Sequence, residues 1–176
     1  MGQSSTLYEI NKSDFSRIEN DTSLFKPDIS ISYEIFEQNF SGIEFILKKT
    51  VDKNITEKID EIFNPKQCLG EPVDYENIDF TQIDFSEIED NSINYLNPEL
   101  IKEINTVLNS ISTNEFIDKY NSSELNKNGI YPEVWHDDES DDQAFNQRHI
   151  AEGIEQLKSI LNRTEKNENY IFMFSG

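Results

Sequence analysis

The sequence predicts an α+β single domain in which a small sheet, containing an N-terminal and a C-terminal strand, packs against several amphipathic helices. Residues 6–10 have the character of a strand, and residues 170–174 form a continuous apolar run. A short run of this kind is typical of an interior strand that is buried on both faces. Between these two segments, apolar residues recur at three- and four-residue steps, which is the spacing of helices with one buried face.

Composition supports one domain spanning residues 1–176 and restricts its partners. The chain of 176 residues is 35% hydrophobic and 11% aromatic, which is enough to build a core. It carries 35 Asp and Glu against 15 Lys and Arg, a net charge of −20. This charge disfavours nucleic acids and anionic membranes as partners. The single cysteine, Cys68, excludes an internal disulfide and a Cys-rich metal site, and it favours a reducing cytoplasm as the location.

Three helices are expected in the first third of the chain, over residues 13–18, 33–49 and 56–63. Ser13 is a suitable N-cap for the first helix, and Pro65 ends the third. The second helix is predicted by apolar residues at helical spacing. These residues are Phe36, Phe40, Ile43, Ile46 and Leu47.

An acidic loop is expected at residues 71–92. Residues 71–90 hold eight acids and no Lys or Arg, and two similar five-residue units within them place Ile and Phe at equal spacing. Two copies are too few for a solenoid, so we expect the apolar residues to anchor the loop to the domain. The acids proposed here for partner binding are Asp79, Asp84, Glu87, Glu89 and Asp90.

The second half of the chain has clear start signals. A strand is expected at residues 93–96, and Asn97 followed by Pro98 predicts a helix to about residue 110. The capping box Ser112 to Glu115 opens another helix to about residue 120, and a further turn is expected near residue 122. A final helix is predicted over residues 145–161. The strand at residues 170–174 should then lie in the middle of the sheet beside residues 6–10, so removing the last seven residues should abolish folding.

The loop at residues 128–136 contains the candidate ligand site. Asn128-Gly129 predicts a turn, and Trp135, the only tryptophan, is expected to anchor the loop to the core. This loop has two interpretations. In the first, it borders a cleft for a small ligand, lined by Tyr131, Glu133, Trp135 and His136. In the second, Tyr131 and Trp135 only close the edge of the core.

The segment after Trp135 is the best metal candidate, because two histidines and five carboxylates occur within fourteen residues. Its residues are His136, Asp137, Asp138, Glu139, Asp141, Asp142 and His149. It lacks the glycine of an EF-hand loop and the fixed histidine spacing of zinc motifs. We therefore expect a solvated helix start, without a metal or another cofactor.

No Gly-x-Ser-x-Gly elbow and no phosphate-binding glycine loop is present, so an enzyme is less favoured than a binding protein.

Several short segments, taken in order, resemble the YfbM-like proteins, a bacterial family of unknown function. They include Leu69-Gly70-Glu71-Pro72, Tyr95-Leu96-Asn97-Pro98 and Gly129-Ile130-Tyr131-Pro132 with Trp135. The acid-rich residues 74–90 depart from the family pattern. The resemblance implies an α+β single domain and provides no catalytic residues.

Two classes of function remain open at this point. In the first, a small acidic bacterial protein binds a basic protein partner, as immunity proteins and nucleic-acid mimics do. Its surface would combine residues 71–90 with Asp137, Asp138, Glu139, Asp141 and Asp142. The alternative is an enzyme or small-ligand binder that uses residues 131–136.

Overall fold

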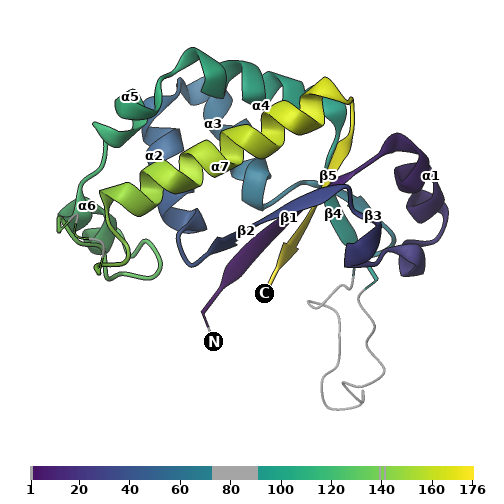
Figure 1. Ribbon diagram of the computed structural model, residues 1–176, viewed down its shortest axis with the longest axis horizontal. Helices are drawn as coiled ribbons and strands as arrows, with labels where there is room; N and C mark the ends of the chain where they lie inside the picture. The colour runs from purple at the N-terminus through teal and green to yellow at the C-terminus, as the bar shows by residue number, and fades with distance from the viewer. Residues whose placement is uncertain (1, 73–90, 139, 141) are drawn as a thin grey trace.

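The computed structural model describes residues 2–72, 91–138, 140 and 142–176 (Figure 1). Its described strands form one antiparallel sheet in the order β2-β1-β5-β4-β3, which confirms the predicted α+β fold. The strands are β1 (Ser4–Ile10), β2 (Ser32–Glu37), β3 (Gln67–Leu69), β4 (Ile93–Leu96) and β5 (Tyr170–Ser175). The predicted central position of the C-terminal strand is also confirmed, because β5 lies between β1 and β4.

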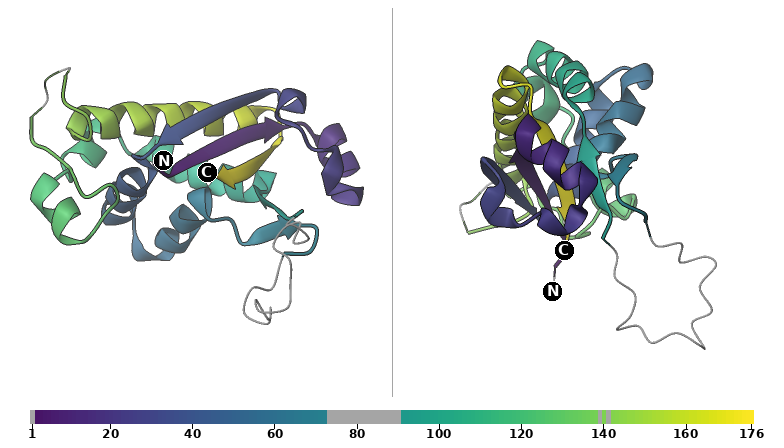
Figure 2. Two further views of the ribbon diagram at one scale, coloured as in Figure 1. Left: turned by 90° about the horizontal axis from the view of Figure 1, so that it is seen from below. Right: turned by 90° about the vertical axis from the view of Figure 1, so that its right-hand side faces the viewer.

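Helices cover the sheet unequally. Figures 1 and 2 show the long helices α4 and α7 along one side, whereas α1 lies at one end of the sheet. The α-helices are α1 (Lys12–Asn20), α2 (Phe40–Thr50), α3 (Lys53–Phe63), α4 (Pro98–Ser110), α5 (Thr113–Ile117), α6 (Ser122–Lys127) and α7 (Gln147–Lys166). Two 3-10 turns, η1 (Thr22–Leu24) and η2 (Pro27–Ile29), connect α1 to β2. Among the described residues, no helix is long and apolar enough to cross a membrane.

The central strand contributes to two hydrophobic clusters because its side chains alternate between faces. Ile171 and Met173 join the larger cluster under α2, α3, α4 and α7. Phe172 joins the smaller one, where it packs with Phe15 and Ile18 of α1. Burial on both faces explains why residues 170–174 are apolar without interruption.

The prediction of a helix over residues 33–49 is wrong for its first part. Residues 32–37 form β2, and only from Phe40 does the chain become helical. Gln38 separates the two elements with a φ of 54°, a left-handed conformation that neither a strand nor a helix continues through. Within β2, Tyr33 and Ile35 are exposed while Phe36 is buried, which is the alternation of a strand.

Several predicted starts are confirmed, with small shifts in length. Asn97 caps α4 by accepting a hydrogen bond from the Leu100 N–H at 2.8 Å, and the Ser112 capping box opens α5. The α5 helix ends at Ile117, earlier than expected. The α7 helix begins at Gln147, after Phe145, because the φ of Phe145 is 56°.

Candidate functional site

Trp135 anchors the loop that precedes α7. Its side chain is 2% exposed, and its indole N–H donates to the Ile130 carbonyl at 2.8 Å. The Asn126 side chain accepts from the Trp135 N–H and donates to its carbonyl, each at 2.9 Å. The ring lies so close to α2 that a Cβ built on Gly42 would be 2.3 Å from Cη2 of Trp135. The indole is therefore part of the core, as an anchor requires.

The other three residues of the candidate ligand site have different surroundings. The Tyr131 hydroxyl accepts from the Gln3 N–H at 3.1 Å and so ties this loop to the chain before β1. Glu133 and His136 are exposed. The His136 backbone N–H donates to the Phe145 carbonyl at 2.9 Å. The structure thus places Trp135 inward and leaves the carboxylate and the imidazole on the surface.

Tyr120 holds the same loop from α5's side. Its hydroxyl donates to the His136 carbonyl at 2.6 Å. Burial and the nearby Asp137 carboxylate raise the pKa of Tyr120 to about 12. The phenol consequently remains a neutral donor at physiological pH, and it fixes the backbone where the acids begin.

Residues 137–142 are called here the acidic loop, which is distinct from the acid-rich loop expected at residues 71–92. Asn146 ties Asp138 of this loop, and Gln143 just after it, to the start of α7. This side chain is fully buried. Its amide donates to the carbonyls of Asp138, at 2.8 Å, and Gln143, at 3.0 Å, while its Oδ1 accepts from the His149 N–H. Asn146 was missed by sequence reasoning, although an Asn before a helix is a known N-cap signal.

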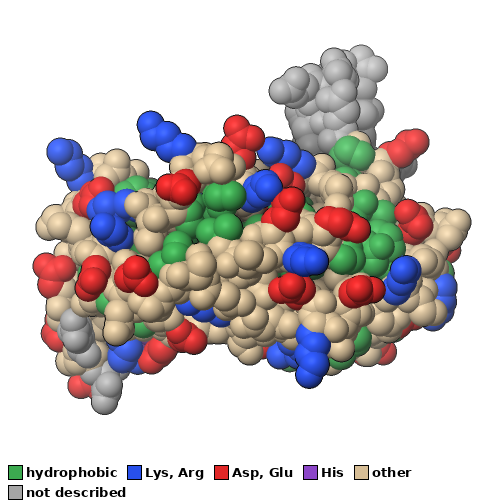
Figure 3. All heavy atoms as spheres, turned by 90° about the horizontal axis from the view of Figure 1, so that it is seen from above, with side chains coloured by type: hydrophobic (Ala, Val, Ile, Leu, Met, Phe, Trp, Pro, Cys, Tyr) green, Lys and Arg blue, Asp and Glu red, His purple; other side chains and the backbone are tan. Residues whose placement is uncertain are grey.

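The described acids of this loop are exposed and have no cationic partner. Asp137, Asp138 and Asp142 make no ion pair within the described part of the chain. Hydrogen bonds from the backbone and side chain of Ser140 lower the pKa of Asp138, so this carboxylate stays ionised. The acids of the helical side differ, since Lys49 pairs with Glu124 and Lys58 with Glu103. Figure 3 shows this face, where basic and acidic side chains are interspersed.

The metal interpretation finds little geometric support. Among the described residues, no three His, Cys, Asp or Glu side chains come together as a metal site. The Nδ1 atom of His149 accepts from the Phe145 N–H at 2.8 Å, which supports the left-handed backbone of Phe145. Glu139 and Asp141 lie outside the described residues. So do the partner-binding candidates of the earlier acidic segment, namely Asp79, Asp84, Glu87, Glu89 and Asp90, together with its two similar units.

A different acid, Glu9 of β1, is buried at the opposite end of α7. It is fully buried, yet its carboxylate accepts from Arg163 Nε at 2.9 Å, Asn169 Nδ2 at 2.8 Å and Ser32 Oγ at 2.7 Å. Burial alone would raise the pKa of Glu9, but these three donors outweigh it and hold the pKa below its ordinary value. Sequence reasoning missed this network, whose members are far apart in the chain.

A hollow of about 360 Å³ lies between the end of β2 and the start of α7. Ile35, Glu37, Gln38 and Asn39 line one side, and Phe145 and His149 the other. Asn39 is the N-cap of α2 but makes no capping hydrogen bond, and its buried Oδ1 has no partner among the described residues.

Fold and site together define a small α+β domain in which exposed acids precede its longest helix and Asn146 ties the backbone at Asp138 to the start of that helix. The chain belongs to the family described as a domain of unknown function, DUF1877, whose model matches residues 1–174. None of the curated proteins compared with the chain matches it.

A solved structure with a similar fold is a protein of unknown function, YfbM, from Escherichia coli. The two chains are 18% identical with a TM-score of 0.59, and the match covers 97% of this chain and 98% of that one. The resemblance to YfbM-like proteins is therefore confirmed, and the likeness at this identity shows the fold alone.

Proposed function

We propose that this protein binds a basic protein partner through the acidic loop, and that it does so in the cytoplasm. One observation carries the proposal. Asp137, Asp138 and Asp142 are exposed and make no ion pair with a described residue, while the carbonyls of His136, Asp138 and Gln143 beside them accept hydrogen bonds from Tyr120 and the buried Asn146. Unpaired like charges repel each other, so a partner that supplies cations gains more here than at acids that are already paired.

The hydrogen bonds to the carbonyls of His136, Asp138 and Gln143 add to this argument. Backbone that is fixed before binding loses less conformational entropy when a partner arrives. The net charge of −20 also creates a long-range field that attracts basic proteins and accelerates their encounter at low salt. Cys68 is a free thiol, which is compatible with a reducing compartment.

Association kinetics test the proposal. The partner is captured from the source cell on the immobilised protein, identified, and its on-rate is measured between about 50 mM and 500 mM salt. Replacing Asp137, Asp138 and Asp142 with Asn should lower the low-salt on-rate about tenfold and flatten its salt dependence.

A matched variant controls for net charge. Glu19→Gln, Glu57→Gln and Glu168→Gln change the charge by the same amount at exposed acids outside the acidic loop, and Glu168 lies just after the C-terminal end of α7. This control should change the on-rate by less than about threefold, because the three acids act only through the overall field. Equal effects of the two triple variants, or none from either, would refute a role of the acidic loop.

A further inference from the structure

The outer edge of β2 has no paired strand among the described residues, although two of its carbonyls accept hydrogen bonds from Gln156 and Asn39. In the order β2-β1-β5-β4-β3, β2 pairs only with β1, so no described strand pairs with its other edge. Figure 1 shows β2 as the outermost strand, running toward the start of α7. An open edge of this kind is a template for an added strand unless charge, proline or a bulge protects it.

The register identifies which backbone groups face outward. The Gln38 N–H donates to the Gln3 carbonyl at 3.0 Å, and hydrogen-bonded pairs alternate along an antiparallel ladder. Tyr33, Ile35 and Glu37 therefore turn their N–H and C=O groups away from β1. Two contacts agree with this, since Gln156 Nε2 donates to the Ile35 carbonyl at 3.2 Å and the Asn39 N–H donates to the Glu37 carbonyl. The N–H groups of all three residues and the Tyr33 carbonyl remain for a partner strand.

Side chains along this edge are apolar and acidic. Tyr33 and Ile35 are 55% and 44% exposed, and Ile31 just before them is 53% exposed. Residues 27–47 contain four acids and no Lys or Arg. Arg163 lies 3.6 Å from Glu34 and Lys48 pairs with Glu44, so Asp28 and Glu37 are the acids here that make no ion pair with a described residue. The acidic loop reaches the same end of the molecule, because Ala144 and Phe145, which follow it within three residues, line the hollow with Ile35 and Glu37.

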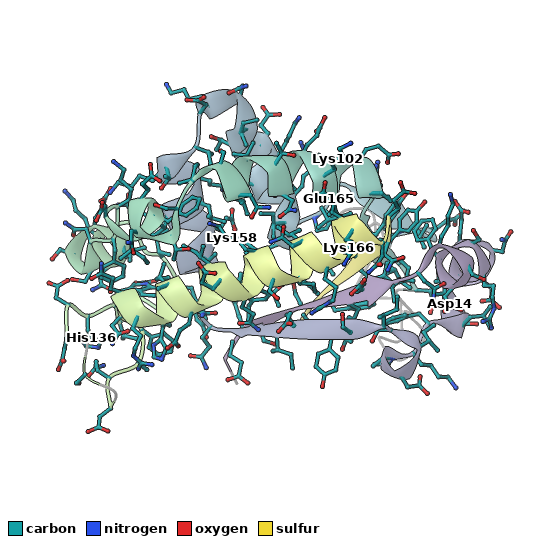
Figure 4. The ribbon with its side chains drawn as sticks, turned by 45° about the horizontal axis from the view of Figure 1, so that its top comes forward. Asp14, Lys102, His136, Lys158, Glu165 and Lys166 are labelled. Carbon is teal, nitrogen blue, oxygen red and sulfur yellow. The ribbon has the colours of Figure 1, made fainter. Side chains whose placement is uncertain are left out.

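The hollow suits a long basic side chain. Ile35 and Phe145 offer apolar surface for its methylene groups, while Glu37 and the unpartnered Oδ1 of Asn39 are acceptors for its charged head. None of the hollow's lining residues is Lys or Arg. Figure 4 shows His136, the last residue before the acidic loop, at this end of α7.

We infer that the basic partner contributes an extended segment that pairs with the outer edge of β2 as an additional strand and places a Lys or Arg side chain in the hollow beside Glu37. This inference rests on the proposed function and specifies how the same partner docks. A second copy of this chain is a poorer occupant, because it also carries a net charge of −20.

Defined peptides test the inference without the natural partner. The probe is a fluorescent, terminally blocked nonapeptide in which lysine alternates with valine. One comparison peptide has proline in place of a central valine, which removes a backbone donor while the charge is kept. A second has glutamate in place of each lysine. We expect the lysine peptide to bind at 50 mM salt, the proline peptide to bind at least about tenfold more weakly, and the glutamate peptide not to bind.

Protein variants locate the peptide. Tyr33→Pro removes an outward N–H that does not bond to β1, so it should weaken peptide binding about tenfold. Tyr33→Val keeps this N–H and should weaken binding less than about threefold. Glu37→Gln should also weaken binding, and the amide resonances of Tyr33, Ile35 and Glu37 should shift in a titration. If Tyr33→Pro does not fold, the proline peptide still measures the role of backbone pairing.

The outcomes separate this inference from the proposed function. Equal affinity for the lysine and proline peptides, or preference for the glutamate peptide, overturns strand addition at β2. If the captured partner still depends on Asp137, Asp138 and Asp142 in that case, the proposed function stands while the docking mode falls. If neither the peptides nor the partner respond to any of these changes, both are wrong.

Discussion

The two ends of α7 use acidic residues in opposite ways. Near its C-terminal end, Glu9 is fully buried and bonded to Arg163, Asn169 and Ser32. Near its N-terminal end, Asp137, Asp138 and Asp142 are exposed and make no ion pair with a described residue. The Glu9 carboxylate has a role within the fold, whereas these three carboxylates make no hydrogen bond or ion pair with a distant part of the described chain, and Asp138 bonds only to its neighbour Ser140. Acidic composition therefore does not reveal function until each acid has been located.

The largest effect is expected at Trp135, which anchors the N-terminal end. Trp135→Ala should lower the free energy of unfolding by about 3–5 kcal/mol, because a buried aromatic side chain is lost and a cavity remains. Thermal and urea unfolding measure this change. Val134→Ala is the control, since Val134 is 47% exposed and should change stability by less than about 0.5 kcal/mol. A melting temperature lowered by less than about 2 °C in Trp135→Ala would show that the ring does not anchor the loop.

The second largest effect on stability is expected near the C-terminal end of α7. Arg163→Met should lower stability by about 2–3 kcal/mol, because Glu9 would stay buried with one charged donor fewer. Arg17→Met makes the same substitution in an exposed ion pair, because the Arg17 side chain is 64% exposed beside Asp14. This control should change the free energy of unfolding by less than about 0.5 kcal/mol. Urea unfolding at neutral pH compares the two, and similar values would contradict the contrast between buried and exposed ion pairs.

A smaller, pH-dependent effect is expected from Glu9→Gln. Because the folded-state pKa of Glu9 lies below its ordinary value of about 4.3, its stabilisation is present above that pH and is lost as the pH falls through the folded pKa. The variant should be about 1–2 kcal/mol less stable than the wild type at pH 7. Its deficit should shrink below about pH 4. A deficit that stays constant with pH would mean that the charge of Glu9 contributes nothing.

The smallest effect on stability is expected from neutralising the acidic loop. Replacing Asp137, Asp138 and Asp142 with Asn should leave the melting temperature within about 2 °C of the wild type, because these side chains are exposed and unpaired. Differential scanning calorimetry measures this. A large rise would mean that mutual repulsion strains the fold, and a large fall that the acids support it. Either result would remove the contrast between the two ends of α7.

Much of the fold was predictable because local signals agreed with tertiary packing. The apolar residues of β5, the Asn97-Pro98 start of α4 and the Ser112 capping box each have a mechanism that acts within a few residues. The β2 strand was not predicted, because Phe36, Phe40 and Ile43 keep a helical spacing across the break at Gln38. The three-residue β3 was too short to give a pattern.

The candidate site was less predictable because its main features are relations between distant residues. Sequence identified Trp135 and the acids after it, but not the clamp by Asn146 or the open edge of β2 beside Phe145. It also could not distinguish Glu9 from the other acids, since the partners of Glu9 are 23, 154 and 160 residues away. Polarity predicts exposure on average, and a buried charge is recognised only when its donors are known.

The central position of β5 has a consequence for synthesis on the ribosome. Both β1 and β4 need β5 to complete their hydrogen bonding, and β5 is the last strand to be made. At about 5–20 residues per second, β1 waits roughly 8–30 s after it emerges before its neighbour exists. During that time the facing edges of β1 and β4 are unsatisfied, and the net charge of −20 disfavours association between copies of the chain through mutual repulsion.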